Sequence, residues 1–340
     1  MKRLVCISVI GLFILCSFLA ASMPAHAQGK VIKLKFANFF PPVHKNSIVA
    51  EQWCKEVEKR TNGRVKVSYF PGATLVSVDQ AYEAAVAGIV DIALFVPQYT
   101  AGRFPLTEVI QLPMGVKNAL QGTKMINAWY QKFKPKEYDD VKIIWLVTAP
   151  PGLFLTKKPL GSINDLRGLK IRAPGDTGKI VSAMGAVPVS VPPTDLYDGL
   201  QRGVIDGVNM TPECLKGWKL ADLIRGMQEN PGIGHVDANG VVMNKQKWNS
   251  LPPDIQQIID RINEEWIEKA GRTWDDIDKE GREYGISKGL KVFKIPPEEA
   301  RISVEKMKPL LDAYVKRMKE KGLPGEESLK FCQDYLKSHP

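Results

Sequence analysis

The stretch from Asn164 to Met210 constrains the fold more than any other part of this 340-residue chain. Apolar segments alternate here with short helical segments, in the order strand, helix, strand, helix, strand. Proline and glycine residues mark the breaks between them. Strands that alternate with helices in this way indicate a sheet of the α/β class with parallel strands. In such sheets ligands bind beyond the carboxyl ends of the strands.

Two polar side chains fall at these strand ends. Arg172 closes the first predicted strand (169–173), and Asn209 follows the third (204–208). A guanidinium presents a planar fork of N–H donors that matches the two oxygens of a carboxylate. The pattern therefore predicts a site for an organic anion, with Arg172 as its anchor; a surface salt bridge is the alternative role for this arginine.

The N-terminal part of the chain repeats the same order of elements. Predicted strands at 31–38, 64–70 and 91–96 enclose predicted helices at 47–61 and 79–87. Two copies of one supersecondary pattern indicate two lobes of similar topology. We expect the chain to cross between the lobes at 148–152 and to return near 236–240.

The C-terminal third is helical. Apolar residues from Ile255 to Ile277 recur every three or four positions, which predicts one helix over 252–289 or two helices broken near Gly271. Further helices are predicted at 211–227, 309–321 and 326–338. A helix as long as 252–289 would extend past a single lobe.

Residues 1–27 have the pattern of a cleavable signal peptide. Lys2 and Arg3 precede an apolar segment, and Ala25-His26-Ala27 forms a small-x-small cleavage site. An N-terminal membrane anchor is the alternative. We expect a soluble mature protein exported to the periplasm.

Charge and cysteine content narrow the class further. The net charge is +10, but the basic residues are dispersed rather than gathered in a stripe with aromatic residues, so nucleic-acid binding is not expected. Three cysteines remain after cleavage, Cys54, Cys214 and Cys332; they allow at most one disulfide, and Cys54 is expected to be buried in a helix.

An exported enzyme is the first competing class. The sequence contains no GxSxG, HExxH or GxxxxGK[ST] motif, and no GxGxxG follows the first strand. Asp91 and Asp206 follow glycine-containing turns, yet nothing in the sequence couples them as an acid/base pair. We therefore expect a binding protein, with no catalytic residue, no cofactor and no metal ligand.

Several segments in fixed order resemble the extracytoplasmic solute-binding proteins of TRAP transporters, of the DctP type. The resemblance covers essentially the whole mature chain and is most specific between 166 and 207. The segments that carry it are KRTNGRV (59–65), FPGATL (70–75), LRGLKIRAP (166–174), MGAVPV (184–189), DLYDGLQRGVIDG (195–207) and WNSLP (248–252).

The resemblance implies a two-lobe periplasmic binding protein fold of the α/β class, with crossover strands and a long C-terminal helix spanning both lobes. Lobe I would comprise 28–149 with 238–277, and lobe II 150–237 with 278–305, while 306–340 would form helices packed on the body. It also implies capture of an anion by hinge closure and delivery to a membrane permease. Arg172 is the family's carboxylate-binding arginine, and Asn209 falls where polar ligand contacts are common.

The sequence departs from the acid-sugar and dicarboxylate binders of that family. Those relatives place a second basic residue near Gly152, where this chain has PPGLF, and Met210 replaces a polar residue. We therefore expect a pocket with one carboxylate anchor and an apolar, aromatic remainder. Its candidate residues are Arg172, Asn209, Met210, Phe39, Phe40, Asn38, Phe95, Tyr99, Gly152 and Trp218.

The expected ligand is a hydrophobic or aromatic monocarboxylate or a 2-oxo acid. A C4-dicarboxylate or sugar acid remains the alternative, as does a partner that is a sensor rather than a permease. His44, Cys214 and Asn239 are further candidates for ligand contact. A monomer is the default, and the sequence leaves open whether a metal ion takes part in binding.

Overall fold

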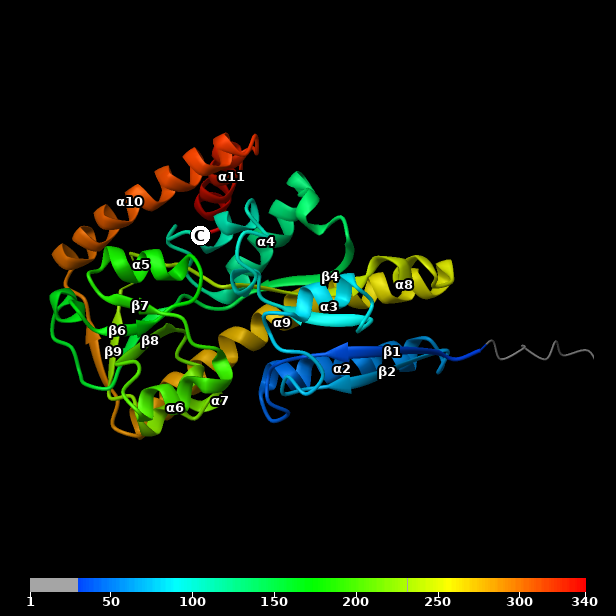
Figure 1. Cartoon of the computed structure of the whole chain (residues 1–340), viewed down its shortest axis with the longest axis horizontal. Coiled ribbons are helices and arrows are strands. Elements are labelled where there is room, and N and C mark those ends of the chain that lie inside the picture. The colour runs from blue at the N-terminus through cyan, green and yellow to red at the C-terminus, as the bar shows by residue number, and fades with distance from the viewer. Residues whose placement is uncertain (1–29, 231) are drawn as a thin grey trace, which may run out of the picture.

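The computed structural model describes residues 30–230 and 232–340, so the predicted signal peptide lies outside the described residues. Two mixed β-sheets form the centre of the molecule, and helices cover them (Figure 1). This arrangement confirms the predicted α/β fold with two sheet-centred halves. Within the described residues no helix is both long enough and apolar enough to cross a membrane.

The first sheet has five strands in the order β2-β1-β3-β10-β4. β1 pairs in parallel with β2 and β3, whereas β10 runs antiparallel to β3 and β4. The strands are β1 (Ile32–Ala37), β2 (Val65–Phe70), β3 (Ile92–Phe95), β4 (Val141–Thr148) and β10 (Ala238–Asn244); the helices around them are α2 (Lys45–Arg60), α3 (Ala81–Val86), α4 (Ala119–Phe133) and α8 (Lys245–Asn249).

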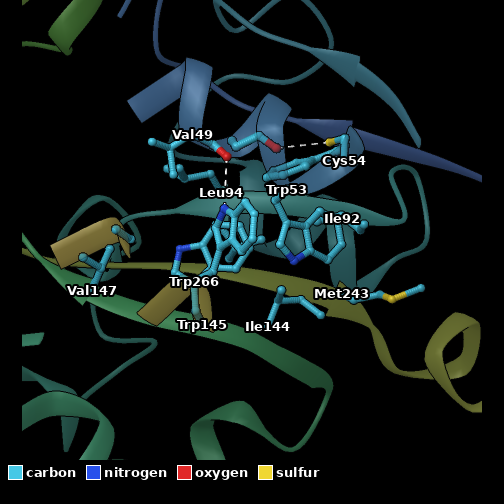
Figure 2. Packing of buried hydrophobic residues seen from close by; sticks show 14 of the residues in the cluster. Val49, Trp53, Cys54, Ile92, Leu94, Ile144, Trp145, Val147, Met243 and Trp266 are labelled. Atoms are coloured by element: carbon cyan, nitrogen blue, oxygen red, sulfur yellow. Dashed lines mark hydrogen bonds between the residues drawn. The ribbon is translucent and has the colours of Figure 1, made fainter. Parts of the chain in front are cut away.

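Three tryptophans lock α2 and the long helix α9 (Pro253–Ser287) onto one face of this sheet (Figure 2). Trp53 packs against Trp145 with ring centroids 5.7 Å apart. The Trp266 indole N–H donates to the Val49 carbonyl at 3.1 Å. Cys54 is buried here as predicted, and its thiol donates to the carbonyl of Ala50. Because aromatic pairs in a dry core add to the energy of burial, this face holds the two helices rigidly to the sheet.

The second sheet has six strands in the order β11-β9-β5-β8-β6-β7. Two apolar clusters cover its two faces. Its strands are β5 (Leu153–Thr156), β6 (Lys170–Arg172), β7 (Val187–Val189), β8 (Gly207–Met210), β9 (Gly226–Glu229) and β11 (Lys291–Lys294); the helices α5 (Thr177–Ala183), α6 (Leu196–Gln201) and α7 (Cys214–Gly217) accompany them.

The helix α9 is continuous and connects the two halves. Figure 1 shows it passing from the region of β4 and α8 toward α6 and α7. Gly271 lies inside this helix, and the helix is not broken there. The absence of a side chain at Gly271 allows α4 to pack closely, since a Cβ there would lie 3.2 Å from Thr123 Oγ1 and 3.3 Å from Leu120 Cα. Of the two forms predicted from sequence, the structure has the single helix.

Two helix predictions were wrong. The segment predicted as a helix over 211–227 instead contains the short helices α7 and η6 (Leu220–Asp222), separated at Lys219, whose backbone is left-handed with a φ of 59°, and its last two residues belong to β9. The helix predicted from 309 begins earlier, as α10 (Pro297–Glu320), with Pro309 inside it. α11 (Gly325–Ser338) follows as predicted. The remaining short 3-10 helices are η1 (Pro97–Tyr99), η2 (Thr107–Gln111), η3 (Lys136–Tyr138), η4 (Ile163–Leu166) and η5 (Pro193–Asp195).

The chain crosses between the sheets after β4 and again before β10. The two crossings are hydrogen-bonded to each other: the Ala149 N–H donates to the Asp237 carbonyl at 2.9 Å, and the Gly152 N–H donates to the His235 carbonyl at 3.0 Å. The carboxyl ends of strands from both sheets meet beside this junction, where a ligand site is expected.

Candidate ligand-binding site

A small cavity of about 40 Å³ lies between the two sheets, next to the crossings. Residues from both sheets line it. Six of the ten predicted site residues are among them: Phe39, Phe40, Tyr99, Arg172, Met210 and Trp218. A cavity of this volume holds no more than a few water molecules.

Arg172 is the basic side chain of this cavity and is only 1% exposed. It closes β6, which is held in parallel between β7 and β8. Its Nε donates to the Val191 carbonyl at 3.0 Å, and its Nη2 donates to the Tyr99 hydroxyl at 2.7 Å. Within the described residues no carboxylate oxygen lies within 4.0 Å of its guanidinium. A buried cation without a counterion is costly, so this position is suited to an anion brought in from outside.

Tyr99 connects the two halves through this hydrogen bond, since it belongs to η1 after β3 and Arg172 belongs to β6. Burial raises the pKa of the Tyr99 phenol; the Arg172 charge opposes the shift and the Asp237 carboxylate adds to it. The phenol therefore stays protonated at neutral pH and can donate as well as accept.

Aromatic rings form the opposite wall. Phe39 and Phe40 follow β1 and stack on each other with centroids 4.3 Å apart. Trp218, from the segment after α7, lies nearly parallel to Phe39 at 6.4 Å, and Trp274 of α9 meets Phe40 edge-on at 5.9 Å. Such a wall offers flat apolar surfaces to a ring or a branched chain.

Asn38 and Phe95 do not line the cavity. The Asn38 amide donates to the Tyr69 hydroxyl at 2.7 Å, and its Oδ1 accepts the Phe40 N–H at 3.0 Å, so both ends are occupied in holding the loop after β1. Phe95 packs in the core against Tyr82 and Phe104. All four residues of β3 are buried, and strand alternation therefore gave no sign of which face held a ligand.

Gly152 and Asn209 lie together beside the cavity rather than in its lining. A Cβ on Gly152 would come within 2.6 Å of the His235 ring and 3.4 Å of Asn209 Oδ1. Asn209 is 2% exposed, and neither of its amide atoms has a hydrogen-bond partner. Nδ1 of His235 is likewise buried and unpartnered, and burial lowers the pKa of this imidazole.

The cavity also contains residues that the sequence did not single out. Two are acids, Glu213 and Asp237; the others are Val96, Gln98, Ala149, Pro193, Thr211 and Trp274, together with the weaker candidate Asn239. Asp237 lies on the return crossing and Glu213 at the start of α7, where no local pattern marks a site. An acid in a segment predicted to be a hinge was the one available signal.

Glu213 is satisfied by a partner across the cleft. His44 Nε2 lies 2.9 Å from Glu213 Oε2, and His44 Nδ1 accepts the Asn46 N–H at the start of α2. The imidazole proton therefore lies on Nε2 and is donated to the carboxylate. Behind Glu213, burial raises the pKa of the Asp278 carboxyl to about 7.

The remaining reactive side chains are the possible metal ligands and the thiols. No group of three or more His, Cys, Asp or Glu side chains in the described part of the chain is arranged to hold a metal ion. Cys54, Cys214 and Cys332 are buried free thiols, so the single disulfide that the sequence allowed is not formed.

Comparisons with known proteins identify the family of the chain. Residues 36–317 match the family described as bacterial extracellular solute-binding protein, family 7 (DctP). A TRAP solute-binding protein from Rhodoferax ferrireducens, solved with copurified benzoate, is 30% identical with a TM-score of 0.86, covering 91% of this chain and 98% of that one.

Two further relatives differ in ligand. A TRAP periplasmic solute-binding protein from Bordetella bronchiseptica, solved with bound (R)- and (S)-mandelate, is 28% identical with a TM-score of 0.84, covering 91% of this chain and all of that one. The C4-dicarboxylate-binding periplasmic protein DctP of Vibrio cholerae is 26% identical over 80% of this chain and 83% of its own. The chain belongs to family 7 of the bacterial extracellular solute-binding proteins, the periplasmic solute-binding proteins of TRAP transporters.

Proposed function

We propose that this protein captures a hydrophobic or aromatic monocarboxylate, or a 2-oxo acid with such a side chain, in the periplasm. The ligand carboxylate pairs with Arg172, and its apolar part lies against the rings that follow β1 and α7. One observation carries the proposal: a guanidinium that is 1% exposed faces a cavity and has no protein carboxylate within 4.0 Å in the described residues.

The energetics favour an anionic ligand at this position. Arg172 has five N–H donors, and two of them have protein acceptors in the described residues, Val191 and Tyr99. A carboxylate can take two of the remaining donors in a bidentate pair, which is stronger than a bond between neutral groups. The ion pair with the ligand would thus offset the free-energy cost of burying the Arg172 charge without a counterion.

The rest of the lining favours a monocarboxylate over a dicarboxylate. Among the described lining residues Arg172 is the only basic side chain, whereas Glu213 and Asp237 are acids. A second ligand carboxylate would meet these acids without a cation to balance it. Phe39, Phe40 and Trp218 instead offer aromatic surface. The ligands in the Rhodoferax and Bordetella structures, benzoate and mandelate, fit such a lining.

Ligand entry requires the two halves to move apart, because the cavity of about 40 Å³ is too small for an aromatic acid, and the halves would then close around the bound ligand. We place the hinges at the paired crossings after β4 and before β10, with the lobe boundaries that the sequence predicts at 149/150 and 237/238. The closed form would then be recognised by the TRAP membrane permease, which completes transport.

A ligand panel monitored by thermal unfolding tests the proposal. We expect benzoate, phenylacetate, mandelate and branched 2-oxo acids to raise the melting temperature, and Arg172→Met to abolish every shift. Exposed Arg202, at the end of α6, provides the matched control: Arg202→Met should keep all shifts. Strong shifts with succinate or malate and none with aryl or branched acids would contradict the proposed ligand class and favour the dicarboxylate alternative.

A further inference from the structure

The two acids of the cavity differ in their partners. Glu213 accepts a hydrogen bond from His44. Asp237 presents an enclosed Oδ1 that receives no hydrogen bond. Its backbone is nonetheless fixed, because its carbonyl accepts the Ala149 N–H at 2.9 Å and the Asn239 side-chain amide at 3.2 Å. The structure therefore holds an unmatched carboxylate in a defined place on the cavity wall.

Asp237 lines the same cavity as Arg172 and Tyr99. Its charge contributes to the raised pKa of the Tyr99 phenol, which is the group that accepts from Arg172. Asn209 and His235, which lie beside the cavity and not in its lining, also have enclosed polar atoms without partners. Buried polar groups in native proteins are almost always hydrogen-bonded, so the unpaired Oδ1 of the lining residue Asp237 marks a place where a ligand supplies the partner.

We infer that the ligand carries a hydrogen-bond donor, a hydroxyl or amino group, in addition to its carboxylate, and that Asp237 accepts this hydrogen bond. The inference rests on the proposed function and narrows its ligand class. A plain aryl carboxylate brings a negative charge into a cavity that already holds the Asp237 carboxylate. A donor on the ligand converts that unfavourable contact into a charge-assisted hydrogen bond.

The site should therefore discriminate strongly against ligands that lack the donor. Water can hydrogen-bond the Asp237 carboxylate in the ligand-free protein, whereas a ligand without a donor removes that water and leaves the acceptor unpaired, which lowers the binding free energy. Sites built around such an acceptor therefore reject analogues that lack the matching hydroxyl or amine. The specificity would come from Asp237, whereas Arg172 would bind all carboxylates. The two roles can be separated by experiment.

Titration calorimetry with matched pairs of ligands tests the inference on the wild-type protein. The pairs are benzoate against 2-, 3- and 4-hydroxybenzoate, and phenylacetate against mandelate and phenylglycine. We expect at least one carboxylate that carries a hydroxyl or an amino group to bind about 10- to 100-fold more tightly than the unsubstituted carboxylate of its pair. The hydroxyl and amino arms then identify which donor is preferred. Equal affinity within every pair would overturn the inference.

Substitution of Asp237 assigns the effect to this residue. In Asp237→Leu the substituted and unsubstituted carboxylates of each pair should bind within about twofold of each other. The unsubstituted carboxylates should bind as well as before or better, because the Asp237 charge no longer repels them. Asp237→Asn, which keeps an acceptor without the charge, should retain part of the preference. Asp198→Asn is the matched control, since Asp198 is exposed on α6, and should leave the preference unchanged.

The outcomes separate this inference from the proposed function. A full hydroxyl preference that persists in Asp237→Leu would overturn the role of Asp237, while loss of all binding in Arg172→Met would still support carboxylate capture. If no aryl acid binds the wild-type protein at all, the proposed ligand class fails first. The melting temperature of each unliganded variant confirms that it is folded.

Discussion

Asn38 and Asn209 occupy corresponding places in the two sheets, each at the carboxyl end of a strand, and each is 2% exposed. In the first sheet both ends of the Asn38 amide are bonded, to Tyr69 and to the Phe40 backbone. In the second sheet neither end of Asn209 has a partner. The same residue type in the same context is thus structural in one half and unmatched in the other.

The charged groups of the cleft repeat this contrast. His44 and Glu213 satisfy each other across the cleft, whereas Arg172 has no acid within 4.0 Å in the described residues. Since both sets are buried, exposure does not distinguish them; the difference is in the partners. The aromatic wall combines Phe39 and Phe40 of the first half with Trp218 of the second, so the halves differ in the partners of their buried polar groups rather than in their aromatic surface.

The largest expected effect is the loss of ligand binding in Arg172→Met. Removing one partner of a buried charged pair costs about 3–5 kcal/mol, which corresponds to at least a hundredfold loss of affinity. Titration with a carboxylate found in the panel measures it. The unliganded melting temperature should hold or rise, because an uncompensated buried charge has been removed; a fall of many degrees would indicate that Arg172 supports the fold instead.

The two asparagines allow the same change to be compared in both sheets. Asn38→Leu should lower the free energy of unfolding by about 1–3 kcal/mol, because it leaves the Phe40 N–H and the Tyr69 hydroxyl short of partners. Asn209→Leu should leave stability unchanged or improved, since it removes two unpaired polar atoms, and should weaken ligand binding. Urea unfolding and titration on both variants provide the test. Equal destabilisation by the two changes would remove the contrast.

The free energy of unfolding should depend on pH through Asp278, which lies behind the His44–Glu213 pair. Burial raises the pKa of this carboxyl to about 7 from a usual value near 4, so the folded protein holds a proton that the unfolded chain has lost. Stability from this group is present at low pH and is lost as the pH rises through about 7. Relative to wild type, Asp278→Asn should therefore gain about 2 kcal/mol between pH 5 and pH 8. Urea unfolding at both pH values measures it; a constant difference would contradict the assignment.

The smallest expected effect is that of the Tyr99 hydroxyl. Tyr99→Phe removes the acceptor that orients Arg172 from the first sheet, and we expect a loss of affinity of about fivefold, near 1 kcal/mol. Tyr69→Phe is the matched control, because the Tyr69 hydroxyl bonds to Asn38 and Ser47 away from the cavity. Tyr69→Phe should lower the free energy of unfolding and leave the affinity for the ligand unchanged.

Periodic and local features of the fold could be predicted from sequence. The long helix α9 follows from its regular apolar stripe, and the position of Arg172 follows from a strand bounded by Pro174 and Gly175. The helix predicted over 211–227 is interrupted at Lys219, whose backbone is left-handed, and its last two residues belong to β9, which gains its partners from β5 and β11, distant in sequence. Pairing between distant segments leaves no local signal.

The composition of the candidate site was only partly predictable for the same reason. Phe39, Phe40 and Tyr99 could be proposed because they follow strands, but Phe95, the last residue of β3, faces the core. Asp237 and Glu213 enter the cavity through a crossing and a short helix, so their proximity to Arg172 depends on the packing of the two halves. Whether an asparagine at a strand end is satisfied could be learned only from its partners.

The central claim is that Arg172 awaits a ligand carboxylate, and a crystal structure grown with the tightest-binding aryl acid tests it most directly. We predict both carboxylate oxygens within about 3 Å of the Arg172 guanidinium, with the ring against Phe39 or Trp218. A ligand bound elsewhere, with Arg172 bonded only to Val191 and Tyr99, would contradict the account.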